Sequence, residues 1–190
     1  GTFLVMLAVG IVIGNLTERI RAQARLARTR EHRTLALFRL SDELARSAGS
    51  APLVESAIRS VAAQFQARVA IFLPDSHGRL RPTQTETAAG FREEEQGVSQ
   101  WVFDHHESAG LGTDTLPGAK ALYLPLMGAH GPIGVMGVLP EGVPRWTEPD
   151  QRHLLGAFAN QTALALERAL LVEKGAETQR QMDREQLRNA

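Results

Sequence analysis

Residues 121–139 read ALYLPLMGAHGPIGVMGVL, which is two apolar runs on either side of a short turn. Successive side chains of a strand point to opposite faces, so the first run, 121–127, offers an apolar side chain to both. The turn, 128–132, holds two glycines and a proline, and the second run, 133–139, is rich in valine. Two such runs joined by a short turn predict neighbouring antiparallel strands. We therefore expect the centre of a sheet here.

Helix and strand signals alternate around this hairpin. Acidic residues at the start of 93–105 suit a helix dipole, and Val98, Trp101 and Val102 would face inward. Thr147 is expected to cap the last helix. In chain order we first expect a helix over 52–66, whose apolar face carries Leu53, Ala57, Val61 and Phe65. A strand over 67–74, a turn at 75–78, a weaker strand over 80–85, a helix over 93–105 and a loop over 106–118 follow. The two strands above and a helix from about 150 to the end complete the order. This order predicts an α+β fold with a central antiparallel sheet.

The first residues differ from the rest in composition. Residues 2–14 are apolar and uncharged, and as a helix they would rise about 20 Å against a hydrocarbon core of roughly 30 Å. A signal-peptide core would need a basic segment before it and a cleavage site after it. Instead, six arginines follow in the segment Arg19–Arg33. The positive-inside rule therefore favours residues 1–14 as the end of a last transmembrane helix, with the chain cytoplasmic from about residue 15.

The segment Arg19–Arg33 also bears on partners. A basic segment beside a membrane helix is expected to contact anionic lipid. It lacks the base-stacking aromatic residues that single-stranded nucleic-acid binders use, so no nucleic-acid partner is expected.

A long helix is expected over residues 15–50. From Asn15 to about Ser47 there is no proline or glycine, and good helix formers dominate. Its first turns are too polar for the core of a monomer, so we expect two copies to pair in parallel along a thin apolar seam. A solvated single helix is the alternative. The residues expected at the seam are Ile20, Ala27 and Phe38 on the first helix, and Leu154, Phe158, Ala165 and Val172 on the last.

Composition excludes several kinds of chemistry. The chain has no cysteine, so it has no disulfide, thiolate metal site or cysteine nucleophile. Its formal net charge is zero, which gives no indication of nucleic-acid binding. No catalytic motif is visible, and none of the six histidines lies in a phospho-acceptor box. We expect no enzymatic activity from this segment.

The order of elements and two motifs resemble the GAF domain family. GAF domains share a strand ending in Pro-Leu, a short turn and then Ile-Gly-Val, which here are Leu122–Leu126 and Ile133–Val138. The segments Trp101–Asp104 and Ala109–Gly118 more closely resemble the GAF region of the KdpD family, the membrane sensor histidine kinases of potassium-transport two-component systems. Two further segments agree with this resemblance, namely Phe158–Arg168 and Glu185–Ala190.

The resemblance implies a domain plan and a function. Residues 1–14 would end the last transmembrane helix, 15–50 form a signalling helix, 51–148 form the GAF domain, and 149–190 form an exit helix or coiled coil leading to an absent kinase core. The segment would relay a potassium or osmotic signal from the bacterial inner membrane to that core as a homodimer. ATP would bind the absent core, which would act on a response regulator, and no cofactor is expected in the segment itself. The alternative is a GAF domain that itself binds a cation or a nucleotide-like molecule.

One loop and three aromatic residues are the candidate binding site. Gly110, Gly112 and Thr113 could form a nest of N–H groups for an anion. Alternatively, loop carbonyls with Asp114 and Thr115 could face a cation, or the loop could be a tight turn bonded to itself. The aromatic residues that could line a pocket between helix and sheet, or fill an ordinary core, are Trp101, Phe103 and Tyr123. A metal site at 105–107 is not expected, because three adjacent ligands rarely converge.

Overall fold

A computed structural model describes residues 33–83, 90–91 and 95–188 of the chain. The chain divides into two compact units, 1–38 and 39–190, and of the first only 33–38 are described. Those six residues are helical. The predicted membrane segment at 1–14, most of the basic segment, and the seam residues Ile20 and Ala27 lie outside the described residues. Among the described helices, none combines the length and apolar character that a membrane crossing requires.

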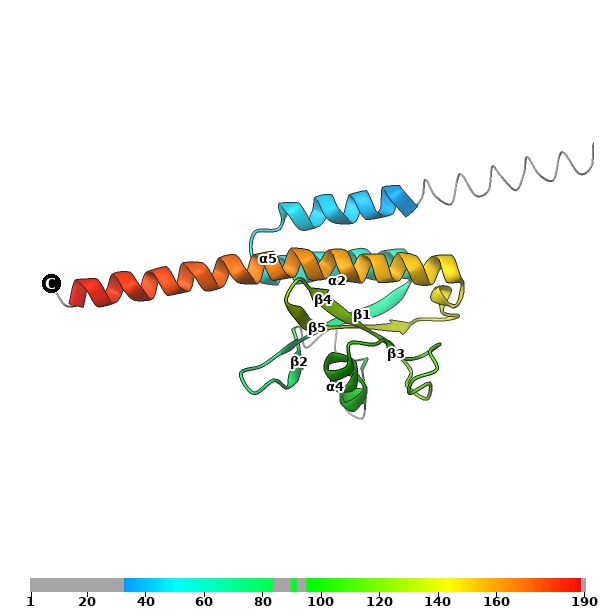
Figure 1. Cartoon of the computed structure of the whole chain (residues 1–190). Helices are drawn as coiled ribbons and strands as arrows, with labels where there is room; N and C mark the ends of the chain where they lie inside the picture. Colours follow the sequence, from blue (N-terminus) through cyan, green and yellow to red (C-terminus); the bar gives the residue numbers. More distant parts are fainter. Residues whose placement is uncertain (1–32, 84–89, 92–94, 189–190) are drawn as a thin grey trace, which may run out of the picture. The chain divides into compact units, whose positions relative to one another are not determined.

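The second unit is built on a five-stranded antiparallel sheet in the order β2-β1-β5-β4-β3 (Figure 1). The strands are β1 (Ala67–Pro74), β2 (Leu80–Pro82), β3 (Ala109–Gly110), β4 (Leu122–Gly128) and β5 (Gly131–Pro140). The central hairpin expected from the sequence is confirmed as β4 and β5. β2 is shorter than predicted, with 84–89 outside the described residues. The two-residue β3 was not predicted, because it is embedded in the segment assigned to a loop.

β5 is the middle strand and pairs with both β1 and β4. Its pairing with β4 shifts register between Leu126 and Met127, where Leu126 faces Gly134 and Met127 faces Pro132. A Cβ added at Gly134 would clash with the carbonyl oxygen of Phe72. Glycine at this position therefore permits both the bulge and the close approach of β1.

Two helices, α2 (Ser50–Phe65) and α5 (Pro149–Arg188), cover one face of the sheet, and α4 (Gln96–His105) lies on the other (Figure 1). The predicted inner face of α2 is confirmed, since Leu53, Ala57, Val61 and Phe65 are all buried. Phe65 meets Phe158 of α5 edge-to-face, with ring centroids 5.8 Å apart. This aromatic pair joins the two helices above the sheet.

A short 3-10 turn, η2 (Arg145–Thr147), precedes α5. The prediction that Thr147 caps α5 is wrong, because its hydroxyl donates to the carbonyl of Pro144 within the turn. The helix begins two residues later, at Pro149. Trp146 is fully buried, so η2 anchors the start of α5 through this side chain.

Helical structure also covers residues 33–46. Within the second unit, Leu40 and Leu44 of this helix are buried. Glu43 accepts a hydrogen bond from the hydroxyl of Ser60 on α2. The turns that contain these residues therefore pack on the domain.

Candidate functional site

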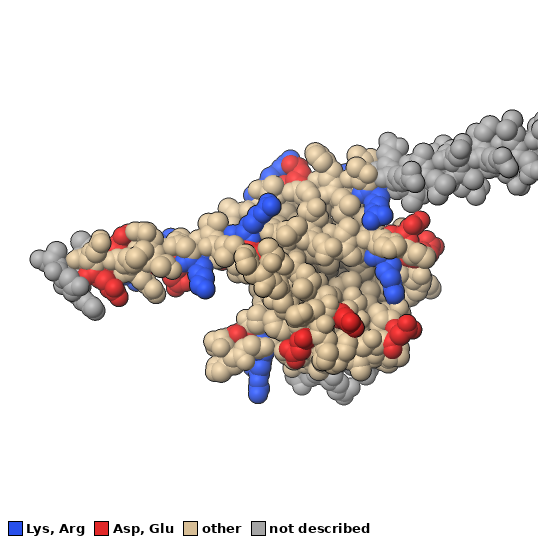
Figure 2. All heavy atoms as spheres, viewed as in Figure 1, with Lys and Arg blue, Asp and Glu red and all other residues tan. Residues whose placement is uncertain are grey.

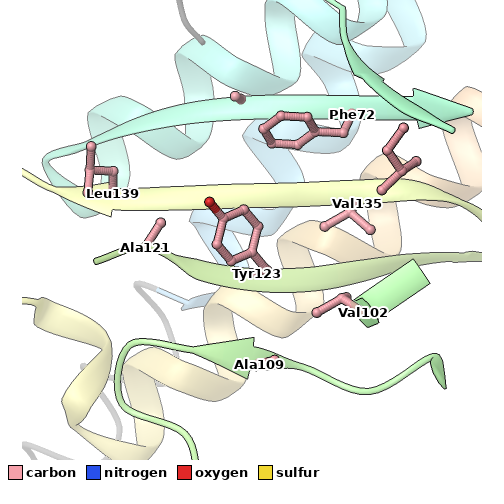
Figure 3. Close-up of a cluster of buried hydrophobic side chains, with 9 residues drawn as sticks. Phe72, Val102, Ala109, Ala121, Tyr123, Val135 and Leu139 are labelled. Carbon is pink, nitrogen blue, oxygen red and sulfur yellow. The ribbon is translucent and has the colours of Figure 1, made fainter. Parts of the chain in front are cut away.

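The space between α4 and the sheet is filled by side chains of the same chain. Tyr123 of β4 and Phe72 of β1 are buried there (Figure 3). Phe91 contacts both rings, with centroid distances of 6.2 Å to Tyr123 and 5.8 Å to Phe72. The predicted pocket residues Trp101 and Phe103 pack against this cluster while partly buried. The three aromatic residues named from the sequence therefore belong to one aromatic cluster between helix and sheet.

A buried carboxylate closes this cluster. Glu95, the residue before α4, accepts a hydrogen bond from the Tyr123 hydroxyl on Oε2 at 2.9 Å and one from the backbone N–H of Lys120 on Oε1 at 2.9 Å. Burial raises the pKa of Tyr123, and the hydrogen bond to Glu95 and its negative charge raise it further. The phenol therefore stays protonated at neutral pH and works as a donor.

Sequence reasoning missed Glu95. It treated the acidic residues before α4 as partners of the helix dipole, and nothing in their spacing distinguishes the one that is buried. A signal does exist: one tyrosine occurs in the chain, on the apolar face of a predicted strand, and a buried tyrosine hydroxyl requires a partner. The sequence does not show which residue is the partner, because that residue lies in a different segment of the chain.

The loop between β3 and β4 is hydrogen-bonded to itself. The N–H groups of Gly110 and Thr113 donate to the carbonyls of Thr115 and Gly110, at 2.8 and 3.0 Å. The Thr113 hydroxyl lies 2.8 Å from the carbonyl oxygen of Gly110 and 2.7 Å from that of Thr115. Leu111 donates to the carbonyl of Ala121. Two amides of the expected anion nest, those of Gly110 and Thr113, are thus directed at carbonyls of this chain.

Two further groups of this loop have different surroundings. The carbonyl of Gly112 accepts a hydrogen bond from the guanidinium of Arg152, in the first turns of α5. Asp114 is exposed, on the same loop. The loop is therefore attached to α5, and Asp114 lies apart from the aromatic cluster.

The surface of α4 carries a stacked pair. The rings of Trp101 and His105 are nearly parallel, with centroids 4.2 Å apart, and Nδ1 of His105 lies 2.9 Å from the carbonyl oxygen of Trp101. Among the described residues no three histidine or carboxylate side chains are grouped so as to hold a metal ion.

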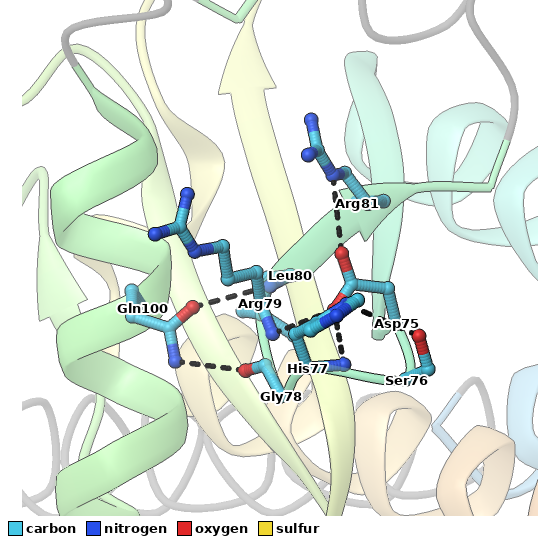
Figure 4. A network of polar contacts seen from close by, with 8 residues as sticks. All are labelled: Asp75, Ser76, His77, Gly78, Arg79, Leu80, Arg81 and Gln100. Carbon is cyan, nitrogen blue, oxygen red and sulfur yellow. Dashed lines mark hydrogen bonds and ion pairs between the residues drawn. The ribbon is translucent and has the colours of Figure 1, made fainter.

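The turn between β1 and β2 fixes the position of α4. Asp75 accepts hydrogen bonds from the N–H groups of His77 and Arg79, at 2.9 and 3.0 Å (Figure 4). Gln100 of α4 accepts one from the N–H of Leu80 at 3.1 Å and donates to the carbonyl of Gly78. The side-chain-to-backbone bonds of Gln100 therefore attach α4 to this turn.

The seam residues expected on the last helix separate into two groups. Leu154 and Phe158 are 5% and 2% exposed and pack into the domain's own core, so they cannot lie on a face left free for a second copy. Apolar residues spaced by three and four form one face of a helix, and this spacing is the same whether a sheet or another helix covers that face. Ala165 is half-buried, whereas Val172 is 72% exposed. Phe38, in the first unit, is 69% exposed.

A groove lies beside the outer part of α5 in the second unit. Its volume is about 420 Å³. It is lined by Ser41, Leu44, Ala45, Ser47, Gly49, Leu53, Gln161, Leu164, Ala165, Arg168, Ala169, Val172 and Glu173. It was not predicted, because it lies between helices that are far apart in the sequence.

Comparison with known proteins decides the family. A family model described as a GAF domain matches residues 50–168, which include the sheet, α2, α4 and the part of α5 that covers the sheet. The chain belongs to the GAF domain family. The GAF fold expected from the sequence is thereby confirmed.

Relatives of this GAF domain are sensor proteins. The chain is 39% identical to the sensor protein KdpD of Escherichia coli over 189 residues and 29% identical to the KdpD of Clostridium acetobutylicum over 196 residues. All or nearly all of the chain is covered, but only 21% of each relative, so the chain spans about a fifth of their length. The solved GAF domain of the E. coli potassium sensor histidine kinase KdpD superposes with a TM-score of 0.67 at 31% identity, covering 75% of this chain and 99% of that one. The resemblance to the KdpD GAF region is confirmed.

Proposed function

We propose that this chain is the regulatory segment of a KdpD-like sensor histidine kinase, and that it passes a potassium or osmotic signal from the inner membrane to a kinase core through a dimeric helix–GAF–helix unit. In this proposal ATP binds the kinase core, and the response regulator is that core's partner. The GAF segment contributes position and movement rather than catalysis.

The observation that carries the proposal is the continuity of α5. This single helix of 40 residues spans about 60 Å. Its first turns are buried on the sheet through side chains such as Leu155 and Leu166, and from Leu171 onward its side chains are exposed. A helix without a break transmits rotation or translation from the sheet to whatever follows it.

Pairing with a second copy is supported by the outer face of α5. Leu164, Leu171 and Met182 are exposed apolar residues spaced by seven and eleven, so they return to one side of the helix. The exposed end of the helix otherwise carries both acidic and basic side chains (Figure 2). An apolar stripe among mixed charges is typical of a helix that pairs along a narrow seam. This stripe replaces Leu154 and Phe158 as the proposed contact.

Two experiments test the proposal. Sedimentation of the 190-residue chain is expected to show a dimer that Leu171→Glu weakens, while Arg180→Glu, half a turn around the helix, does not. In the membrane-bound parent kinase, inserting two alanines after Thr178 rotates the following helix by about 200° and inserting seven preserves the seam. Autophosphorylation that responds equally to both insertions, or to neither, would count against the relay.

A direct ligand-sensing role is the second candidate, favoured by the aromatic cluster at α4. Trp101 and Phe103 are only partly buried against the cluster that contains Tyr123, the hydrogen-bond partner of Glu95, so a small movement of α4 would admit a ligand. Titration with potassium chloride and with cyclic nucleotides, followed by calorimetry and by the intrinsic fluorescence of Trp101 and Trp146, tests this role. Saturable heat with a change in fluorescence would support a ligand-sensing role. If both signals are absent, the relay is the only one of the two proposed functions that stands.

A further inference from the structure

The N-terminus of α2 is capped by a side chain from α5. The N-cap position of α2 is Gly49, and no side chain of its own segment caps the helix. Glu173 accepts a hydrogen bond from the Ser50 N–H on Oε1 at 2.7 Å and one from the Ser50 hydroxyl on Oε2 at 2.9 Å. The first N–H groups of a helix require partners, and a carboxylate also suits the helix dipole. Glu173 therefore bonds α5 to the start of α2.

A second carboxylate of α5 holds the turn between β4 and β5. Glu167 accepts hydrogen bonds from the N–H groups of Ala129 and His130, at 2.8 and 3.3 Å. Nδ1 of His130 lies 3.1 Å from the same carboxylate, whose side chain is only 13% exposed. Glu167 precedes Glu173 by six residues, so the two contacts lie about 9 Å apart along the helix.

Both contacts use the space left by a glycine. A Cβ added at Gly128 would lie 2.7 Å from Oε1 of Glu167, and one added at Gly49 would lie 3.1 Å from Oε1 of Glu173. A side chain at either glycine would therefore take part of the space that the carboxylate occupies. The same arrangement occurs at two independent elements, a sheet turn and a helix N-terminus.

Apolar packing of α5 on the domain ends between the two contacts, since Leu166 is fully buried and Leu171 is 57% exposed. The groove of about 420 Å³ borders this part of α5, and α5 contributes the small side chains Ala165 and Ala169 to its wall. Beyond Glu173 the described part of α5 is exposed through residue 186. Glu173 is therefore the last side chain of α5 with a hydrogen bond to another element among the described residues.

We propose that Glu167 and Glu173 form a latch that fixes the position of α5 where it leaves the GAF domain, and that a signal passes when this latch opens. The inference rests on the proposed relay and names its moving part. Helix movements in known switches measure about 1–2 Å, which is enough to break hydrogen bonds of this length. Moving α5 along its axis must therefore release both carboxylates.

Spin labels can test the latch directly. The chain has no native cysteine, so Ala63→Cys on α2 and Glu177→Cys on α5 are labelled alone, with unlabelled chain in excess to suppress signals between copies. The parent sequence is expected to give one narrow distance distribution. E167Q/E173Q is expected to broaden it or shift it by about 1–2 Å, while Glu185→Gln, an exposed carboxylate further along α5, leaves it unchanged.

Two further measurements separate the latch from a loss of folding. Gly128→Ala leaves both carboxylates present but fills the position of Glu167, and it must broaden the distribution as well. Exchange of the Ser50 amide should accelerate by about three- to tenfold in E173Q, the size expected for losing a helix cap, while core strand amides exchange as before.

The outcomes are distinct. The latch would be overturned if E167Q/E173Q and Gly128→Ala both gave the same spin-label distance distribution as the unsubstituted chain. If the distribution changes but autophosphorylation of the parent kinase carrying E167Q/E173Q does not, the latch stands as a structural contact, while its signalling role and the relay are both overturned.

Discussion

The hydroxyl of Tyr123 donates a 2.9 Å hydrogen bond to Oε2 of Glu95, which joins the first strand of the central hairpin to the residue that precedes α4. Both residues are buried, and the other carboxylate oxygen of Glu95 is bonded to the Lys120 N–H. Buried polar groups are costly unless they are paired. The pair therefore specifies how α4 lies on the sheet.

Removing the hydroxyl should be costly even though the ring remains. In Tyr123→Phe, Oε2 of Glu95 loses its donor while still buried, so the free energy of unfolding should fall by about 1–3 kcal/mol. Adding Glu95→Gln should cost less in the Tyr123→Phe background than in the parent, because the interaction is already lost. Urea unfolding of the four proteins of this cycle measures the coupling, and purely additive effects would contradict it.

The raised pKa of Tyr123 gives a spectroscopic prediction. Because burial and Glu95 hold the proton, the folded protein should show no tyrosine ionisation near the ordinary value of 10. The folded state then binds more protons than the unfolded state above that pH, so stability should fall as pH rises beyond it. Tyrosinate absorbance is unambiguous, since the chain has one tyrosine. If Tyr123 ionised near pH 10 while the circular dichroism spectrum stayed native, its hydroxyl could not be the buried donor described above.

Gly134 should not tolerate a side chain. The Cβ of Gly134→Ala would clash with the Phe72 carbonyl oxygen, so β1 and β5 must separate locally. Overpacking of this kind costs about 1–3 kcal/mol. Gly97→Ala in α4 is the matched control, because nothing lies within 4 Å of its added Cβ and alanine favours a helix by about 1 kcal/mol. Thermal unfolding of both variants should show opposite shifts.

Acid should weaken the latch. Hydrogen bonds from the Ala129 N–H and then from the His130 side chain lower the pKa of Glu167, and the Ser50 N–H and hydroxyl lower that of Glu173. The unfolded state, with carboxyl groups at the ordinary 4.5, therefore binds more protons as pH falls. The stabilisation is fully present above that value and is lost as pH drops through the folded pKa values.

Unfolding midpoints measured from about pH 6.5 to about pH 3 test this sign. E167Q/E173Q should be less stable than the parent at neutral pH and should lose less stability on acidification. Glu185→Gln should follow the parent curve. A double variant whose curve runs parallel to the parent's would show that the carboxylates contribute no pH dependence.

Much of the fold could be predicted because its determinants are local. The two apolar runs of 121–139 and the apolar face Leu53–Phe65 each follow from a pattern within one segment, and the structure confirms them as β4, β5 and α2. The turn between the two strands is shorter than expected and comprises residues 129–130. Glu95 could not be identified in this way. Several acidic residues precede α4, and only the position of Tyr123 across the sheet selects one of them.

The sequence alone determined the order of the helices and strands other than β3, the absence of cysteine chemistry and the GAF resemblance, because periodicity, composition and motif spacing are properties of the chain itself. The tertiary structure decided which apolar stripes face the domain's own core, as Leu154 and Phe158 do, and which carboxylates reach another element, as Glu167 and Glu173 do. The spacing of apolar residues on a helical face is the same whatever covers that face. A hydrogen bond between distant segments exists only once folding has brought its donor and acceptor together.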